Sequence, residues 1–186
     1  MTAVLAIGGS AGALEALLEL VGLLPGSYTT PIVVVIHLSP TQKSLIPALL
    51  VAHRRTLEIE DKQPLEASTI YIAPPNYHAL VERGGYLSLS VDEPVQYSRP
   101  SIDVLFDSVA YACGPDATAV LMSGANDDGA AGLARIAAAG GRTYVQDPAT
   151  ATQRAMPAAG LRRVPSARAI TISDLGRELA AGGSTR

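Results

Sequence analysis

A serine in a glycine-rich turn is the first residue of this sequence that could carry out chemistry. Ser10 stands in the pentapeptide GGSAG, residues 8–12, between an apolar segment over residues 3–7 and a segment whose leucines recur at helical spacing. A serine on a sharp strand-to-helix turn has an exposed hydroxyl, and flanking glycines relieve the crowding of such a turn. The N–H groups at the start of the following helix could also stabilise an oxyanion. The pentapeptide indicates a nucleophile, although a glycine-rich turn with a capping serine explains it equally well.

Of the three histidines, His37 has the position that best suits a general base. It directly follows the apolar segment 31–36, which is typical of a strand buried on both faces. His53 lies beside a pair of arginines at a predicted helix end, where a solvated side chain is expected. His78 lies in a proline-rich loop before a predicted hairpin and could be near a site, but it needs no function. A lone histidine at a strand end is more often structural, but a serine turn on an adjacent strand favours the catalytic interpretation of His37.

A third segment supplies carboxylates. The apolar segment 118–122 is followed by SGANDDG, residues 123–129. A carboxylate there could orient His37 and stabilise its protonated form. Aspartates in such loops are usually solvated or cap helices, and spacing alone does not distinguish Asp127 from Asp128. The chain order Ser, His, Asp differs from the order Ser, Asp, His of the α/β-hydrolases, so a standard lipase or esterase of that superfamily is disfavoured.

The elements that must position these residues follow from periodicity, because short apolar segments alternate with helical patterns along the chain. The predicted strands cover residues 3–7, 31–36, 70–73, 118–122, 143–145 and 169–172, and the predicted helices cover 14–21, 44–53, 102–113, 130–139 and 173–181. Residues 79–81 and 86–90 predict a small β-hairpin, and Ser101 is the expected N-cap of the helix that follows.

This alternation predicts an α/β fold: a doubly wound, mostly parallel sheet with helices on both faces and a small β-hairpin. We expect one catalytic domain over residues 1–181 and a flexible tail over 182–186. Ligands bind at the carboxyl ends of the strands in such a sheet. Ser10, His37 and the aspartate loop are therefore expected to share one edge.

Composition excludes several classes of function. The chain has 186 residues, a net charge of -3 and no basic run longer than two residues, so it lacks the stripe of cations that binds nucleic acid. Its single cysteine, Cys113, excludes a disulfide framework and a cysteine-built zinc site, and it favours a reducing compartment. The strongest apolar run, 31–36, is too short to span a bilayer, and the N-terminal apolar stretch lacks a basic leader. We therefore expect a cytoplasmic globular protein without membrane insertion.

Together these segments resemble the catalytic domain of the CheB-type chemotaxis receptor methylesterases, and the likeness covers nearly the whole chain. The segments that carry the resemblance are AIGGSAG at residues 6–12, IHLSP at 36–40, YIAPP at 71–75, RPSIDVLF at 99–106, MSGANDDGAAG at 122–132, QD at 146–147 and MP at 156–157. The resemblance implies Ser10 as the nucleophile and His37 as the catalytic histidine, and its register selects Asp128 as the aspartate.

The resemblance also implies an activity. It is the hydrolysis of glutamate methyl esters on the cytoplasmic helices of methylated chemotaxis receptors through an acyl-enzyme, with glutamine deamidation by the same steps. Ala11, Gly12 and Ala125 would lie at the oxyanion site, and Arg99 could help position the substrate. No metal or organic cofactor is implied, and the oligomeric state is not predicted. Family members often carry an N-terminal receiver domain, but this chain starts at its first catalytic strand, so we expect none here.

Two other functions remain as alternatives. A catalytically silent signalling partner with the same fold is suggested by three departures from the family pattern: Ala11 where threonine is common, Ala125 where methionine is common, and Asn126 where glycine is usual. A nucleotide-binding module could hold phosphate at the start of the first helix. However, Ser10 and Ala13 break the pattern Gly-x-Gly-x-x-Gly, and a Walker lysine is missing.

Overall fold

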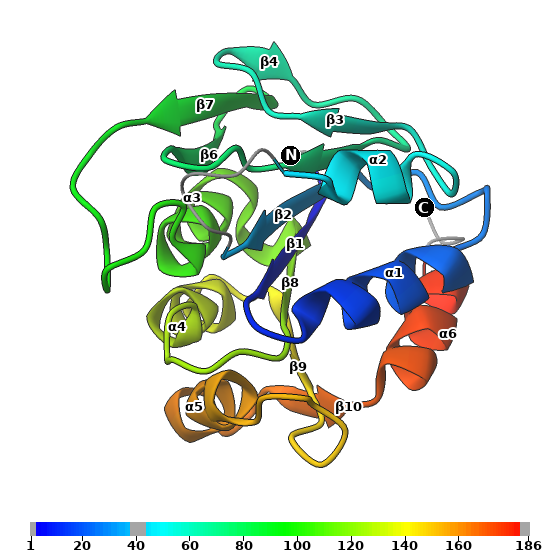
Figure 1. Ribbon diagram of the computed structural model, residues 1–186, viewed down its shortest axis with the longest axis vertical. Helices are drawn as coiled ribbons and strands as arrows, with labels where there is room; N and C mark the ends of the chain where they lie inside the picture. The colour runs from blue at the N-terminus through cyan, green and yellow to red at the C-terminus, as the bar shows by residue number, and fades with distance from the viewer. Residues whose placement is uncertain (1–2, 38–43, 183–186) are drawn as a thin grey trace.

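A parallel sheet forms the centre of this computed structural model, which describes residues 3–37 and 44–182 (Figure 1). Its strands are β1 (Val4–Gly9), β2 (Ile32–Ile36), β3 (Thr56–Glu58), β5 (Ile70–Ile72), β8 (Ala117–Leu121), β9 (Arg142–Gln146) and β10 (Arg168–Ile170). The order across the sheet is β10-β9-β8-β1-β2-β5-β3, and each neighbouring pair is parallel. A smaller antiparallel sheet has the order β4-β7-β6 and consists of β4 (Gln63–Pro64), β6 (His78–Glu82) and β7 (Tyr86–Ser90).

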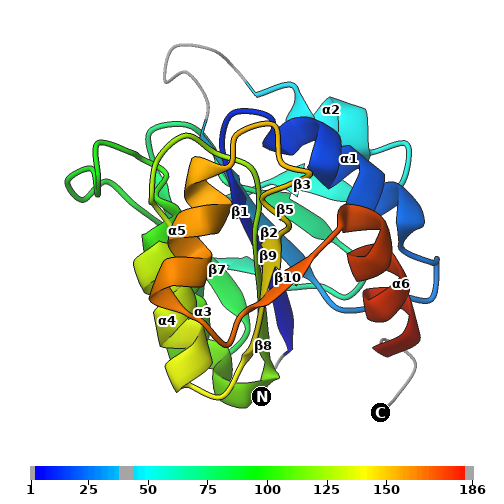
Figure 2. The ribbon, with the colours of Figure 1, turned by 90° about the horizontal axis from the view of Figure 1, so that it is seen from below.

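Helices cover both faces of the large sheet (Figure 2). They are α1 (Ala13–Leu23), α2 (Ile46–Leu50), α3 (Ile102–Cys113), α4 (Ala130–Ala138), α5 (Ala155–Arg163) and α6 (Ile172–Gly182). Helices α3, α4 and α5 and the small sheet pack on one face, and α1, α2 and α6 pack on the other. In β1, Val4 and Ala6 point into the first layer, whereas Leu5 and Ile7 point into the second. All four are fully buried, which explains why this strand is apolar at every position.

The α/β fold predicted from the sequence is confirmed. Each of the six predicted strands of the large sheet is present, with ends that differ by one or two residues, and the predicted helices are present as α1, α2, α3, α4 and α6. The predicted helix 44–53 is shorter than expected, since α2 covers only Ile46–Leu50. The predicted hairpin is present as β6 and β7, with β4 as a third strand.

Among the described residues, two strands, one α-helix and a short 3-10 helix over Gly114–Asp116 have no counterpart in the sequence analysis. Strands β3 and β4 have three and two residues, which is too short for a period to register. Helix α5 contains Pro157 and Gly160, two residues that normally argue against a helix. Pro157 lies in the first helical turn, where the missing N–H is tolerated, and both residues are buried against neighbouring elements.

The expected tail begins inside a helix: Gly182 is the last residue of α6, and residues 183–186 lie outside the described part of the chain. Residues 38–40, which carry part of the sequence block after His37, also lie outside it. Among the described residues, no helix is long and apolar enough to cross a membrane.

Strand β1 is the centre of the sheet and brings the three chemically interesting loops together. Gly9 pairs with Ile36 of β2, and Gly8 pairs with Leu121 of β8. The N–H of His37, one residue beyond Ile36, donates to the carbonyl of Gly9 at 3.1 Å, and the N–H of Ser10, two residues beyond Gly8, donates to the carbonyl of Ser123 at 2.8 Å. Ser10, His37 and Ser123 therefore leave the sheet side by side at its carboxyl edge.

The end of β1 is also where α3 approaches the sheet most closely. A Cβ added to Gly8 would lie 2.2 Å from Cγ2 of Ile102, the first residue of α3. Gly8→Ala is therefore expected to lower the free energy of unfolding by about 1–3 kcal/mol through overpacking. The matched control is Gly26→Ala, because a Cβ there would meet nothing within 4 Å. Urea unfolding measures both changes, and equal losses in the two variants would contradict the packing explanation.

Candidate active site

Ser10 lies on a tight turn between β1 and α1, and its side chain is partly exposed. Its carbonyl accepts a hydrogen bond of 3.0 Å from the N–H of Ala13, the first residue of α1. Gly12 adopts the left-handed conformation with φ of 77°, and a Cβ there would lie 2.4 Å from Cβ of Thr152. Glycine is required at this position by both conformation and space. The turn thus directs the exposed N-terminal end of α1 towards the Ser10 side of the edge.

Ser123, on the loop after β8, stabilises the Ser10 turn by hydrogen bonds. It is fully buried, and its hydroxyl donates to the carbonyl of Ala11 at 2.7 Å and accepts from the N–H of Gln153 at 2.8 Å. The N–H of Ser123 in turn donates to Oε1 of the buried Gln146 at 2.9 Å. The sequence analysis did not single out Ser123 or Gln153. Their contacts fix the backbone on which Ser10 stands.

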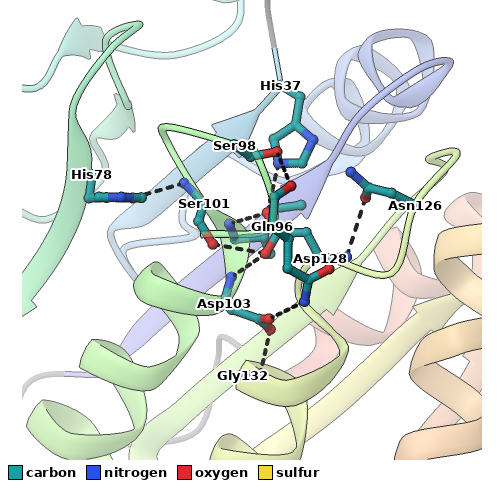
Figure 3. A network of polar contacts seen from close by, with 10 residues as sticks. His37, His78, Gln96, Ser98, Ser101, Asp103, Asn126, Asp128 and Gly132 are labelled. Carbon is teal, nitrogen blue, oxygen red and sulfur yellow. Dashed lines mark hydrogen bonds and ion pairs between the residues drawn. The ribbon is translucent and has the colours of Figure 1, made fainter. Parts of the chain in front are cut away.

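His37 follows β2 directly, and its side chain is 14% exposed. Its Nε2 atom lies 2.7 Å from Oδ2 of Asp128, a residue 91 positions away in the chain (Figure 3). With Asp128 ionised, Nε2 carries the proton and donates it to the carboxylate, which leaves the lone pair of a neutral imidazole on Nδ1. The ring is therefore held in one tautomer, with Nδ1 as its basic atom.

Asp128 is fully buried and accepts four hydrogen bonds (Figure 3). Besides His37, the donors are the hydroxyl of Ser101 at 2.8 Å, the N–H of Ile102 at 2.8 Å and the N–H of Asp103 at 3.0 Å. Burial alone would raise the pKa of Asp128, but the hydrogen bonds from His37, from the two N–H groups and from Ser101 together lower this pKa below its ordinary value. The carboxylate is therefore charged at neutral pH and available to a protonated imidazole.

The neighbouring Asp127 has a different environment. Its side chain is exposed, and its carbonyl accepts from the N–H of Ala130 at the start of α4. The side-chain oxygen of Asn126 accepts from the N–H of Asp128 at 3.3 Å and so helps to shape the loop. Of the two candidates that spacing left open, the structure brings Asp128 to His37 and leaves Asp127 in solvent.

Ser101 is the N-cap residue of α3, as predicted, but it lacks the usual capping bond. Its hydroxyl makes no bond to its own helix and donates to Asp128 instead. The carboxylate of Asp128 accepts the N–H groups of Ile102 and Asp103 in its place. An ionised acceptor binds these N–H groups more strongly than a neutral hydroxyl does, so the long-range contact displaces the local one.

His78 is closer to the site than the sequence indicated. It is 2% exposed, and its Nδ1 accepts from the N–H of Ser101 at 3.1 Å. Its Nε2 lies 3.1 Å from the carbonyl of Glu93, which requires a proton on that nitrogen.

His53 is exposed, as expected. No group of three or more His, Cys, Asp or Glu within the described residues could hold a metal ion.

A pocket of about 270 Å³ opens beside His37 and contains Arg99. Its lining consists of His37, Asn76, Pro94, Tyr97, Ser98, Arg99 and Pro100. One guanidinium nitrogen of Arg99, Nη1, donates to the carbonyls of Val91 at 2.8 Å and Asp92 at 3.1 Å. Nε of Arg99 is buried and has no hydrogen-bond partner within the described residues. The pocket therefore offers a fixed cation next to the imidazole.

The other predicted binding residues lie around this edge but not in that pocket. Ala11 and Ala125 are exposed on the loops after β1 and β8. Gly12 lines a different cavity of about 280 Å³ together with Glu15, Glu19 and Thr152 on the α1 side. Gly12 thus places the Ser10 turn beside the cavity on the α1 side, whereas the lining of the pocket beside His37 includes no residue of that turn.

The charge of Asp128 should be visible in the pH dependence of stability. Because its pKa is lowered on folding from the ordinary 3.8, the ionised group stabilises the fold above that value, and this contribution is lost as the pH falls through the folded pKa. Asp128→Asn is expected to lower the free energy of unfolding by about 1–3 kcal/mol at neutral pH, and the deficit should shrink below about pH 4. Urea unfolding across this range measures it. Asp127→Asn is the control, and a deficit that grows on acidification would contradict the assignment.

The sequence and the fold both match known proteins. The family model described as CheB methylesterase matches residues 5–179. A protein of Leptospira interrogans is 39% identical over 153 residues, which cover 81% of this chain and 79% of that protein. The protein-glutamate methylesterase/protein-glutamine glutaminase of Hydrogenovibrio crunogenus is 38% identical over 160 residues, which cover 83% of this chain and 42% of the relative. This chain therefore spans less than half of that longer relative.

The crystal structure of the Thermotoga maritima CheB methylesterase catalytic domain is 24% identical in sequence and superposes with a TM-score of 0.91. The match covers 97% of this chain and 98% of that domain, which shows the same fold throughout. The family model covers nearly the whole chain, and a relative is 39% identical, so the sequence matches show the family as well as the fold. The chain belongs to the CheB methylesterase family of carboxylic ester hydrolases.

Proposed function

We propose that this chain is a protein-glutamate methylesterase that removes methyl esters from receptor glutamates through a Ser10–His37–Asp128 triad. The observation that carries the proposal is the 2.7 Å contact between His37 and the buried Asp128, made beside the Ser10 turn. Family membership and the names of the relatives support the reaction class. A histidine fixed by a carboxylate beside a turn that carries a partly exposed serine is the arrangement that nucleophilic acyl transfer requires.

In the first step, Nδ1 of His37 takes the proton of the Ser10 hydroxyl as its oxygen attacks the ester carbonyl. The protonated imidazole is stabilised by Asp128, which already holds Nε2–H. The N–H of Ala11, in the turn before α1, and an N–H near Ala125 on the loop after β8 would bind the developing oxyanion. Each such donor lowers the barrier by roughly 3 kcal/mol.

The intermediate then collapses. The C–O bond to the methoxy group breaks, His37 returns its proton to that oxygen, and methanol leaves. Water, deprotonated by His37, attacks the acyl-enzyme and releases the glutamate carboxylate and the Ser10 hydroxyl. An amide nitrogen in place of the methoxy oxygen would leave as ammonia, which is glutamine deamidation by the same steps. The relatives of this family carry both activities in their names.

The proposed substrate is the methylated cytoplasmic helix of a chemotaxis-type receptor, and the proposed location is the cytoplasm. The names of the relatives support glutamate and glutamine side chains of a protein as the substrate class. The single, buried cysteine agrees with a reducing compartment. Arg99 lines the pocket beside His37, and its guanidinium group would donate a hydrogen bond to a substrate carbonyl or carboxylate.

The alternative of a catalytically silent partner is less well supported. Two of the departures from the family pattern, Ala11 and Ala125, change side chains at positions where the proposed oxyanion donors are backbone N–H groups. The third, Asn126, binds the N–H of Asp128 and is compatible with the carboxylate reaching His37. Covalent labelling by a fluorophosphonate, with the labelled residue mapped, separates the two readings. An active hydrolase is labelled at Ser10, whereas a silent partner is not.

Substitution of the triad should abolish turnover. Ser10→Ala and His37→Gln are expected to lower kcat for methanol release from methylated receptor by about a thousandfold or more, and Asp128→Asn by about a hundredfold or more. His53→Gln and Asp127→Asn are matched controls, because each changes an exposed residue of the same type. Wild-type rates in correctly folded triad variants would rule out the mechanism, and no release by the wild-type protein would rule out the activity.

Arg99 should act on substrate binding more than on chemistry. Arg99→Gln is expected to raise KM by about tenfold with a smaller change in kcat, since a hydrogen bond from a charged donor contributes about 1.5–3 kcal/mol. Arg83→Gln is the control, because Arg83 stacks on Tyr111 away from this pocket. Thermal unfolding checks that the loss of the bonds to Val91 and Asp92 does not unfold the variant. An unchanged KM would remove Arg99 from the substrate site.

A further inference from the structure

Three of the four donors that hold Asp128 come from a single place, the start of α3. Ser101 and Asp103 donate to one carboxylate oxygen, Oδ1, while Ile102 and His37 donate to the other, Oδ2. Two of these donors are backbone N–H groups that any sequence would supply. The hydroxyl of Ser101 is different, because it is a side-chain group whose own capping role is taken by the carboxylate it binds. Its contact with Asp128 therefore needs an explanation beyond helix capping.

Ser101 is itself held by a hydrogen bond to His78, which lies on β6 of the small sheet. The N–H of Ser101 donates to Nδ1 of His78 at 3.1 Å, and Nε2–H of His78 is anchored on the carbonyl of Glu93 at 3.1 Å. Ser101 is fully buried and His78 is 2% exposed. Figure 3 shows the resulting line of contacts from His78 through Ser101 to Asp128 and His37. Only the neutral tautomer of His78 with Nδ1 unprotonated can accept this hydrogen bond.

We propose that Ser101 is a positioning residue for the esterase reaction. It orients the Asp128 carboxylate and weakens its negative charge, and His78 holds Ser101 in place for this role. The proposal rests on the proposed function of the Ser10–His37–Asp128 triad. Neither residue touches the substrate; both act through Asp128 on the imidazole. A hydroxyl that donates to Oδ1 fixes the carboxylate plane, and so it fixes the direction in which Oδ2 meets Nε2 of His37.

By donating a hydrogen bond, the Ser101 hydroxyl also partly neutralises the negative charge of the Asp128 carboxylate. Without it, Asp128 attracts the protonated imidazole of His37 more strongly. The other ionisable groups that face this pair are Arg99 and Tyr97 in the pocket beside His37, Asp103 on α3 and His78 on β6. All of them remain when only the hydroxyl is removed. The pH at which the base becomes active therefore reports on Ser101 separately from any loss of stability.

The decisive variant is Ser101→Ala. We expect kcat for methanol release to fall about tenfold with little change in KM, and the acidic limb of kcat/KM to move up by about half a pH unit. The matched control is Thr171→Ala at the start of α6, where the Thr171 hydroxyl accepts from the N–H of Asp174 at 3.2 Å. Both variants lose a hydroxyl at a helix start, but only Ser101→Ala should move the acidic limb. A lower Tm with wild-type kcat and pH profile would reduce Ser101 to a structural residue.

Two variants of His78 test the second half of the proposal and keep it testable if Ser101→Ala does not fold. His78→Asn places an amide oxygen near the position of Nδ1 and can still accept from Ser101, whereas His78→Leu cannot. We expect His78→Leu to lower kcat and shift the acidic limb as Ser101→Ala does, and His78→Asn to lose less. Equal kcat values and pH profiles in these two variants would overturn the role of His78.

Labelling of Ser10 by a fluorophosphonate, followed as a function of pH, makes the readout independent of the receptor substrate. If the wild-type protein is labelled and Ser101→Ala is labelled with the same pH profile, the positioning role fails while the proposed triad stands. If the wild-type protein is not labelled at all, the proposed function fails and the positioning role fails with it.

Discussion

A buried, ionised carboxylate is the constraint on which the rest of this edge of the molecule depends. An unpaired charge inside a protein costs several kcal/mol, so Asp128 is stable there only if its oxygens are satisfied. The start of α3 supplies three of the four donors and must therefore lie against the loop before α4. Glycines on both sides make room for this, because a Cβ on Gly8 or Gly129 would lie 2.2 or 2.6 Å from Cγ2 of Ile102. The burial of the Asp128 carboxylate and the close packing of α3 therefore depend on each other.

The sheet topology explains why residues so distant in sequence meet at one point. Strand β1 lies between β2 and β8, and all three run in the same direction, so the residues that follow them emerge together. Ser10 directly follows the central strand, with His37 on one side and the Asp128 loop on the other. The imidazole then spans from the end of β2 to the carboxylate. Backbone pairing, which is insensitive to side-chain identity, thus brings three distant segments of the chain to one edge.

Much of this could be predicted from local pattern. Apolar runs without alternation indicate strands buried on both faces, and glycines around Ser10 indicate a sharp turn. What could not be predicted depends on contacts between segments far apart. Ser101 fits the local rule for an N-cap, yet a stronger acceptor from the β8–α4 loop takes the helix N–H groups. The sequence indicated that His78 could be near a site but gave it no function, because its contact with Ser101 depends on how the small sheet packs against α3. Helix α5 was hidden by Pro157 and Gly160, which burial makes tolerable.

The difference between contacts made by backbone atoms and contacts made by side chains explains which departures from the family pattern matter. The groups proposed to bind the oxyanion are backbone N–H groups, and three of the contacts that hold the nucleophile turn and the aspartate loop also use backbone atoms. A change of side chain at Ala11 or Ala125 alters the surface that a substrate meets but removes none of these atoms. Asn126 adds a side-chain acceptor to the N–H of Asp128 where glycine would offer none. Substitutions at these positions therefore bear on which substrate is accepted, whereas the proposed chemistry depends on Ser10, His37, Asp128 and the first turn of α3.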